Sequence, residues 1–350
     1  MKVWHRLYEK LIIIENIIAG YEEFRVGKKK KKDVLAFERN REDNLFTLYQ
    51  ELKNKTYLPG TYSKFYVKDP KLRLIHKATV VDRIVHHIVS NELEKIFEPT
   101  FYAHSYSCRK GRGTHRGVLA FQKIALRASK NNTRVCWVVK CDVKKFFASV
   151  NHKILLNILR TKIKDEEFMD LMQKIVTGFY SDRTTDLNNK RGIPIGNLTS
   201  QFFSNIYLNE LDQYVKHIHK VEYYLRYADD FVMLSTSREY LEKMVAEVQT
   251  FLKETLDIEL HPDKIIYRKF ASGVDFLGYI IFPRYILPRT KTKRRLLKKI
   301  RQKVREYKEK KITYERLNQT IQSYLGFLGH ANTYKFRQDL QNLIWFWITE

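Results

Sequence analysis

At 350 residues, the chain is long enough to bury a sizeable core and to form two or three lobes. Its 65 Lys and Arg residues outnumber its 39 Asp and Glu residues, which gives a formal net charge of +26. An excess this large goes beyond what solubility needs and favours a polyanionic partner, nucleic acid before a membrane surface.

Cysteine usage and hydropathy predict an intracellular protein. The three cysteines, Cys108, Cys136 and Cys141, are odd in number and form no Cys-x-x-Cys pair. They predict reduced thiols in a cytoplasmic protein and argue against a zinc site. The apolar run from Leu11 to Ile14 is too short for a bilayer span or a signal peptide, so we expect no membrane partner.

The N-terminal part predicts two helices and a strand pair. Helical apolar spacing runs from about Trp4 to Tyr21, and a second helix fits Arg39 to Lys53. Between them, the basic run Lys28 to Lys32 would either touch phosphate or form a solvated loop, and its residues leave both open. Alternation from Tyr62 to Leu74 predicts a strand pair with Asp69-Pro70 at its turn.

The next segments predict a long helix, a basic loop and a buried strand. The helix runs from about Val80 to Phe97. Glycines from Ser105 to Gly117 expose backbone amides beside Arg109 and Arg112, which suits phosphate contacts or simply a flexible basic loop. The apolar run from Arg134 to Cys141 predicts a buried strand that ends at Asp142.

The second half predicts further helices and short strands. Helices fill Lys153 to Tyr180, and the turn Gly192 to Gly196 precedes an amphipathic helix that reaches about Val215. Another helix spans Arg238 to Thr255, and a short strand region covers Val274 to Phe282.

A basic helix is predicted from Arg289 to Lys311, where we count thirteen Lys and Arg residues and a narrow apolar stripe. Such helices also bind membrane surfaces, but the total charge favours nucleic acid.

Three aspartates carry the strongest chemical signal. Asp229 and Asp230 stand between two apolar, β-prone runs, which predicts a tight turn carrying adjacent carboxylates. A polar hairpin tip is the ordinary alternative for this pair, and a helix cap is the ordinary alternative for Asp142. Together, the three carboxylates are the hard oxygen ligands that paired Mg²⁺ ions take in phosphoryl transfer.

Seven segments of the chain resemble the motifs of reverse transcriptases. They stand in the same order as in that family and cover most of the chain. The matching segments are Lys71–Ile75 with Val81–Val85, Ser105–Gly113, Lys140–Phe147, Gly192–Gln201, Tyr227–Asp230, His261–Lys264 and Phe276–Tyr279. The resemblance implies an α+β right-hand polymerase with fingers, a palm built on an antiparallel sheet with packed helices, and a mainly helical thumb. Its expected parts are an N-terminal helical extension over 1–61, fingers over 62–133, a palm over 134–285 with a helical fingers insertion at about 153–191, and a thumb over 286–350.

The resemblance also implies roles for single residues. Asp142, Asp229 and Asp230, with the backbone carbonyl of Val143, would bind two Mg²⁺ ions, and Lys264 would protonate the departing pyrophosphate. The residues expected at the dNTP and template are Arg73, Phe147, Ile195, Gly196 and Gln201. Those expected on nucleic acid are Arg109, Arg112, Lys293, Arg294, Arg295 and Lys298.

Arg73 would reach the triphosphate or base through its guanidinium. The roles of Phe147 and Lys264 have ordinary alternatives. Phe147 would reject a ribose 2′-hydroxyl, but it could equally be a packed core aromatic. Lys264 alone would suit a solvated helix-start charge.

The subtype rests on a short difference within one motif. Ile195-Gly196 and Ser200-Gln201 stand where group II intron and retroviral-type enzymes usually carry Gln-Gly and Ser-Pro. This resembles the reverse transcriptases of diversity-generating retroelements, which copy a template-repeat RNA into cDNA, misincorporate opposite adenine and use a small basic accessory protein. Ile195 offers only apolar contact where Gln can hydrogen-bond, so we expect relaxed base selection.

Other readings stay open. The chain could instead be a retron, group II intron-like or antiphage-defence reverse transcriptase. An RNA-dependent RNA polymerase is disfavoured by the bulky Phe147, and a non-catalytic RNA-binding scaffold is disfavoured by the presence of all three aspartates. In each polymerase reading the partners are template RNA, its duplex with the new strand, and nucleotides.

Overall fold

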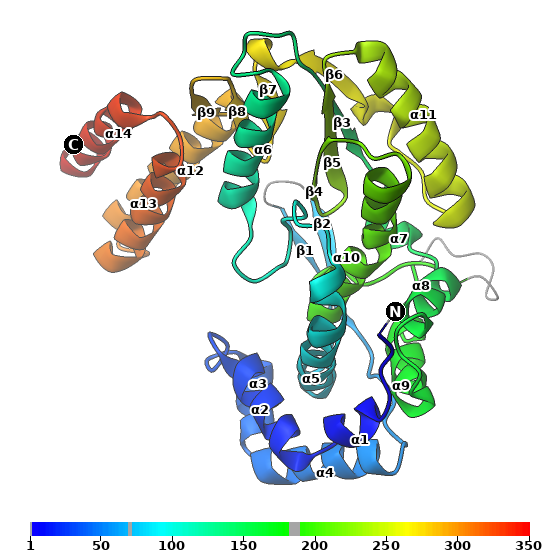
Figure 1. The fold of residues 1–350 in the computed structure, drawn as a ribbon. Helices are drawn as coiled ribbons and strands as arrows, with labels where there is room; N and C mark the ends of the chain where they lie inside the picture. The colour runs from blue at the N-terminus through cyan, green and yellow to red at the C-terminus, as the bar shows by residue number, and fades with distance from the viewer. Residues whose placement is uncertain (1, 69–71, 182–189) are drawn as a thin grey trace.

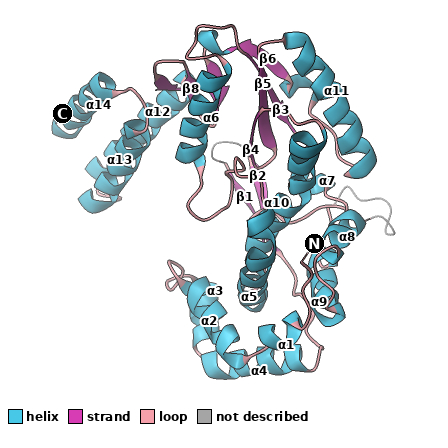
Figure 2. Ribbon diagram, viewed as in Figure 1, coloured by secondary structure: helices cyan, strands magenta, loops and turns pink. Residues whose placement is uncertain are grey.

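A computed structural model describes residues 2–68, 72–181 and 190–350. In the view of Figure 1, the N-terminal helices lie at the bottom, the C-terminal helices lie at the upper left, and the central sheet lies to the right of the C-terminal helices. Strands gather in the middle and helices surround them (Figure 2). In the described ranges, none of the helices is both long and apolar enough to cross a bilayer.

Four short helices form the N-terminal end: α1 (Leu7–Leu11), α2 (Ile14–Arg25), α3 (Lys32–Glu38) and α4 (Arg41–Lys53). The single helix that the sequence predicts from Trp4 to Tyr21 is therefore broken. The Asp165 carboxylate accepts hydrogen bonds from the Leu7 and Tyr8 amides at 2.5 and 2.9 Å, which anchors α1 at the start of a distant helix. The basic run Lys28 to Lys32 forms the turn into α3, a helix that the sequence analysis missed.

An exposed hairpin and two helices follow. Strands β1 (Ser63–Val67) and β2 (Arg73–Lys77) pair antiparallel, as predicted, while Asp69-Pro70 at the predicted turn lies outside the described residues. Helix α5 (Val80–Phe97) begins with a capping box formed by Thr79 and Asp82. A 3₁₀ turn, η1 (Glu98–Thr100), and helix α6 (Thr114–Ala128) complete this part.

The central sheet contains β3 (Trp137–Asp142), β4 (Tyr223–Tyr227), β5 (Asp230–Ser235) and β6 (Ile266–Lys269) in the order β4-β5-β3-β6. Every neighbouring pair is antiparallel. Side chains alternate between two cores, as the pleat requires: Val139 and Met233 join the larger core, whereas Val138 and Val232 join a second core with α6. The sheet is thus buried on both faces.

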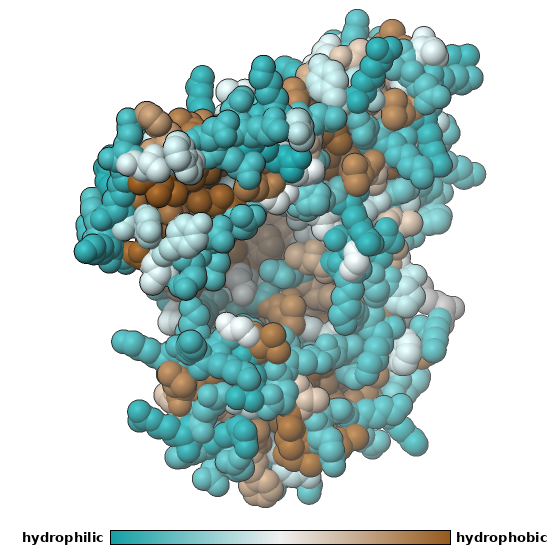
Figure 3. All heavy atoms as spheres, turned by 90° about the vertical axis from the view of Figure 1, so that its left-hand side faces the viewer, coloured by the Kyte–Doolittle hydropathy of each residue, from teal (hydrophilic) through white to brown (hydrophobic). Residues whose placement is uncertain are grey.

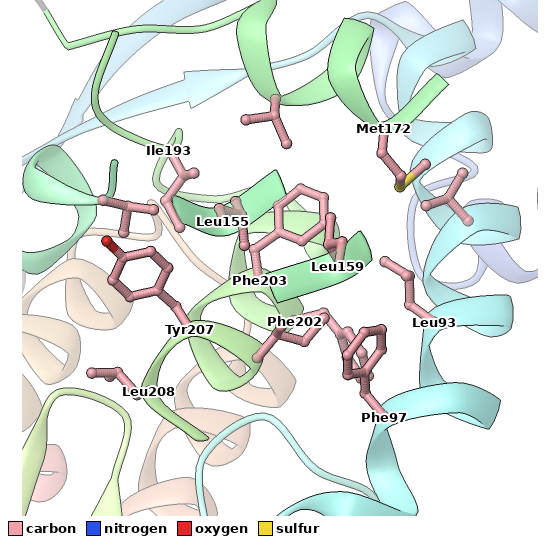
Figure 4. Close-up of a cluster of buried hydrophobic side chains, with 14 of the residues drawn as sticks. Leu93, Phe97, Leu155, Leu159, Met172, Ile193, Phe202, Phe203, Tyr207 and Leu208 are labelled. Carbon is pink, nitrogen blue, oxygen red and sulfur yellow. The ribbon is translucent and has the colours of Figure 1, made fainter. Parts of the chain in front are cut away.

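The helices around the sheet are α7 (Phe146–Ser149), α8 (His152–Arg160), α9 (Glu166–Thr177), α10 (Leu198–Gln213) and α11 (Arg238–Thr255). Helix α10 continues into a π turn, η3 (Tyr214–Ile218). The sequence predicts an amphipathic helix here, but α10 is buried around most of its circumference. Its Phe202 and Phe203 lie among side chains of α5, α8 and α9, including Phe97 and Leu159 (Figure 4).

The C-terminal part has a small sheet and three helices. Two 3₁₀ turns, η4 (Pro262–Lys264) and η5 (Phe270–Ser272), precede β7 (Val274–Phe276), β8 (Tyr279–Ile281) and β9 (Ile286–Pro288). The basic helix α12 (Thr290–Lys308) then packs with α13 (Tyr314–Gly329) and α14 (Tyr334–Thr349). These three helices share a separate apolar core that includes Ile300, Leu317 and Leu340.

Candidate active site

Three aspartates meet at one end of the central sheet. Asp142 ends β3 and pairs in register with Asp230, the first residue of β5. Tyr227 also pairs with Asp230, so only Ala228 and Asp229 form the turn between β4 and β5. The Val143 amide donates to the Asp229 carbonyl at 3.3 Å, which ties this turn to the end of β3.

The three carboxylates are half-buried and lie in a negatively charged environment. Burial raises the pKa of Asp229, and the Asp142 carboxylate raises it further. Burial also raises the pKa of Asp230 to about 6, against the Lys140 ammonium, while Asp142 and Asp229 add to the rise. The nearest cations are Lys264, whose Nζ lies 2.5 Å from Asp142 Oδ1, and Lys140, whose Nζ lies 3.6 Å from Asp230 Oδ1.

The donor chemistry of this cluster fits divalent cations. Carboxylate oxygens are the ligands that Mg²⁺ prefers, and raised pKa values mark negative charge that a cation would relieve. The side chains are not, however, arranged as a ready metal site: in the part of the chain that the structure describes, no group of three His, Cys, Asp or Glu side chains meets that geometry. Instead, the Lys264 ammonium is paired with Asp142.

The loop around Ile195 joins several of the predicted nucleotide contacts. The Ile193 amide donates to the Phe147 carbonyl at 2.7 Å, and the His76 amide of β2 donates to the Ile195 carbonyl at 3.2 Å. Gly196 has φ of +113°, and a side-chain Cβ there would lie only 2.8 Å from Ile75 Cγ2. Only glycine fits at this close approach.

Two of the remaining nucleotide candidates have different surroundings. Arg73 begins β2, and its positive charge acts to lower the pKa of Asp229, against the larger effect of burial. Gln201 is exposed on the first turn of α10, in a hollow lined by α5 and the segment that includes Cys108 and Lys110. Ile195 does not line that hollow, so the structure separates these two parts of the subtype motif.

Arg109 corrects one prediction. Its side chain is 5% exposed and pairs with the Glu98 carboxylate, with a 2.8 Å contact between Nη2 and Oε1. It also donates to the carbonyls of Tyr102 and Ser105 at 2.7 and 2.9 Å. The guanidinium therefore holds the loop together and presents no free edge to phosphate. The predicted contact to nucleic acid from this residue is not supported.

The other basic candidates lie on accessible surfaces. Arg112 is exposed, with its guanidinium 5.5 Å from the centre of the Tyr106 ring. Lys293, Arg294, Arg295 and Lys298 all lie on α12. Lys293 Nζ lies 5.0 Å from the centre of the Phe336 ring of α14. Figure 3 shows the molecule hollowed between its upper and lower halves, with both hydrophilic and hydrophobic side chains around the hollow.

Sequence reasoning missed three charged residues at the site. Lys140 faces Asp230 from the neighbouring strand. Arg226 and Asp212 form a buried ion pair directly behind the turn that carries Asp229. A charged residue in the middle of the apolar run Tyr223–Tyr227 is the signal that could have found Arg226, because such a residue must face water or a partner.

Comparison with known proteins decides the family. Residues 66–281 match the family described as reverse transcriptase (RNA-dependent DNA polymerase). The chain belongs to the reverse transcriptase family. Its right-hand polymerase fold, with an antiparallel palm sheet and packed helices, is thus as the sequence predicts. The members of this family are RNA-directed DNA polymerases.

Individual relatives of this reverse transcriptase include bacterial and mitochondrial proteins. Protein YkfC of Escherichia coli is 27% identical over 66% of this chain and 69% of its own length. The group II intron-encoded protein LtrA of Lactococcus lactis is 24% identical over 69% of this chain and 50% of its own. A putative COX1/OXI3 intron 2 protein of Saccharomyces cerevisiae is 25% identical over 62% of this chain and 31% of its own.

Among solved structures, apo telomerase from Candida tropicalis aligns with this reverse transcriptase with a TM-score of 0.44 and 13% identity, over 65% of this chain and 48% of that chain. Telomerase from Candida albicans, in complex with a fragment of telomeric RNA, aligns with a TM-score of 0.47 and 11% identity, over 74% of this chain and 54% of that one.

Proposed function

We propose that this reverse transcriptase copies a template-repeat RNA into cDNA and misincorporates opposite template adenine, for targeted sequence diversification. The observation that carries the adenine infidelity is Ile195. Its loop is hydrogen-bonded to Phe147 through Ile193 and to β2 through His76, which supports a place for Ile195 beside the other residues proposed to contact the incoming nucleotide. An apolar side chain there withholds the hydrogen bond that a glutamine would supply.

The residues of the site have matching tasks. Asp142, Asp229 and Asp230, with the Val143 carbonyl, would hold two Mg²⁺ ions, which when bound ease proton loss from the primer 3′-hydroxyl and neutralise the pyrophosphate. Lys264, whose Nζ lies 2.5 Å from Asp142 Oδ1, would donate a proton to the departing pyrophosphate. Arg73 would bind the triphosphate, and Phe147 would exclude a 2′-hydroxyl.

The partners follow from the charge and the family. Template RNA, the RNA–cDNA duplex and dNTPs suit a chain with a net charge of +26. A small basic accessory protein oligomer is the further partner we propose for an enzyme of the diversity-generating type. Arg112 and the exposed residues of α12 are the proposed contacts to nucleic acid. We propose the boundaries 1–61, 62–133, 134–285 and 286–350 for the extension, fingers, palm and thumb.

A second candidate is a faithful, group II intron-like reverse transcriptase. The relatives LtrA and the yeast intron 2 protein, each named for an intron, favour this alternative. It shares the aspartates and the chemistry, and it differs in fidelity at adenine and in the RNA that it copies. The two candidates can be separated with purified protein.

The experiment is primer extension on RNA templates that contain all four bases, followed by sequencing of the cDNA. We expect errors opposite adenine to exceed errors opposite the other bases by at least about 10-fold, since one lost positioning interaction is worth about 1–3 kcal/mol. We expect an Ile195→Gln variant to lower the adenine errors by a similar factor. Equal error rates at all four bases would assign the chain to the intron-like candidate, and failure to extend with any dNTP would reject both.

A further inference from the structure

Arg226 and Asp212 form an ion pair in the interior of the palm. Both side chains are 0% exposed. Arg226 Nε donates to Asp212 Oδ1 at 2.8 Å, Nη2 donates to Oδ2 at 2.6 Å, and the Tyr224 hydroxyl donates to Oδ1 at 2.7 Å. Burying two charges is costly, and apolar side chains of similar volume often give equal or greater stability. Stability alone therefore does not explain why a charged pair stands here.

The remaining nitrogen of the Arg226 guanidinium, Nη1, contacts the turn that carries Asp229, which gives a reason for an arginine at this position. Nη1 donates to the Ala228 carbonyl at 3.1 Å and to Asn205 Oδ1 at 3.3 Å. Ala228 is the residue before Asp229, and its φ is +53°, in the left-handed region that an alanine rarely adopts. Strained backbone of this kind persists only where the surroundings hold it.

We propose that Arg226 is a positioning residue that clamps the Ala228–Asp229 turn and so directs the Asp229 carboxylate toward Asp142. The proposal rests on the polymerase function proposed above. Both carbonyls of the turn are held, from two sides: Ala228 by Arg226 and Asp229 by the Val143 amide. Because Asp212 neutralises Arg226, the clamp adds no net charge beside the catalytic carboxylates.

The same clamp joins the turn to the fingers. The Arg226 amide donates to the His104 carbonyl, and the Tyr106 amide donates to the Arg226 carbonyl, each at 3.0 Å. Asn205, which accepts from the guanidinium, donates to the Ser107 carbonyl at 2.8 Å. The segment 104–107 is thus fixed to Arg226 through both its backbone and its side chain. Movement of that segment would be transmitted to Asp229.

Arginine is required because it makes both sets of contacts at once. Its planar guanidinium forms two bonds to Asp212 and still has an edge for the turn. The compact ammonium of lysine keeps the charge and the pairing with Asp212 but cannot span both partners. An Arg226→Lys variant should therefore fold and lose the clamp.

The N-terminal helices offer a matched control. There, Tyr21 and Arg25 both donate to Glu38 Oε1, at 2.8 and 3.2 Å, so a tyrosine, an arginine and a carboxylate form a comparable network among the N-terminal helices. An Arg25→Lys variant makes the identical substitution without touching the turn. We expect it to leave polymerisation within twofold of the wild type.

The test combines kinetics with hydrogen exchange. For Arg226→Lys we expect kcat to fall about 100-fold with little change in the KM for dNTP, because misplacing a catalytic group by about 1 Å costs about that much. In metal-free protein without substrate, we expect the amides of Val143 and residues 228–231 to exchange at least about 10-fold faster. Exchange in α5 should not change.

A second variant separates positioning from stability. In Asp212→Leu/Arg226→Met, apolar side chains replace the pair, which should preserve the fold but leave the Ala228 carbonyl without its donor. We expect the same loss of kcat and the same faster exchange. Wild-type rates and exchange in either folded variant would overturn the proposal, as would failure of both variants to fold, since the pair would then be structural. If the wild type itself does not polymerise, the exchange measurement still decides whether the clamp exists.

Discussion

The surroundings of Asp229 and Asp230 disfavour the negatively charged form of both carboxylates. Burial raises the pKa of both, and each lies beside another carboxylate. Lys140 and Lys264 supply only part of the compensation, because each pairs with a single aspartate. A residue arrangement that is unfavourable alone becomes favourable when a cation is bound, which is the usual condition of a polymerase site.

Phe147 gives a prediction at the same scale. It is partly buried and packs edge-on against the buried Phe146, with ring centres 5.6 Å apart, and its backbone carbonyl accepts a hydrogen bond from the Ile193 amide in the Ile195 loop. Truncation in a Phe147→Ala variant should open space for a 2′-hydroxyl. We expect the preference for dNTP over rNTP to fall by about 10- to 100-fold, measured as the ratio of kcat/KM values. An unchanged preference would make Phe147 a core aromatic only.

At the residue scale, contacts between neighbours in the sequence could be predicted, and contacts between residues further apart in the sequence could not. The turn Ala228–Asp229 lies between two strand patterns, so the sequence places its carboxylates correctly. The partner of Arg109 is Glu98, eleven residues earlier and across a 3₁₀ turn, and nothing in the local pattern indicates that contact. The burial and pairing of Arg109 therefore weigh against its predicted contact with nucleic acid.

At the scale of elements, a helix prediction agreed with the structure where local sequence signals define the helix, and differed where contacts with other elements define it. Helix α5 has a capping box that is legible in the sequence, and its predicted and observed bounds agree. Helix α10 contacts other elements on most sides, so its burial could not be read from a one-sided pattern. The start of α1 is held by Asp165, more than 150 residues away, and this contact could not be predicted locally.

Helix α12 allows a prediction for nucleic-acid binding. Arg294 and Lys298 are exposed on it, whereas Leu296 and Ile300 face the core shared with α13 and α14. We expect an Arg294→Ala/Lys298→Ala variant to bind an RNA–DNA duplex more weakly and to reduce the slope of log K against log salt by about 2. Fluorescence anisotropy over a range of salt concentrations measures this slope. A slope equal to that of the wild type would place the duplex elsewhere.

At the scale of the whole molecule, the buried apolar side chains of the described residues form three cores. The largest includes N-terminal helices and one face of the sheet, the second lies on the other face, and the third belongs to α12–α14. The third core contains only residues of the proposed thumb. Such an arrangement is expected where parts of a polymerase must move relative to one another.

The pH dependence of stability follows from buried histidine. His86 of α5 is buried, and burial lowers its pKa from 6.5 to about 4. Between those values the unfolded chain binds a proton that the folded chain does not, so stability falls as the pH drops below about 6.5 and is unaffected above it. The loss at pH 5 should be about 2 kcal/mol from this residue.

Urea unfolding at pH 7.5 and pH 5 measures the effect. We expect the wild type to lose stability between the two values and a His86→Leu variant to lose markedly less. Burial lowers the pKa of His104 and His152 as well, so part of the dependence should remain in the variant. Equal losses in the two proteins would contradict the assignment to His86.

The most direct measurement compares wild type and Asp229→Asn in single-turnover primer extension on an RNA template with dNTPs. The wild type should extend the primer, and the variant should be slower by at least about 1,000-fold while binding the duplex equally well. In metal-free protein the variant should also be more stable, by about 1 kcal/mol, because a repelled carboxylate has been removed. Extension by the variant at close to the wild-type rate would contradict the assignment of the three aspartates as the catalytic centre.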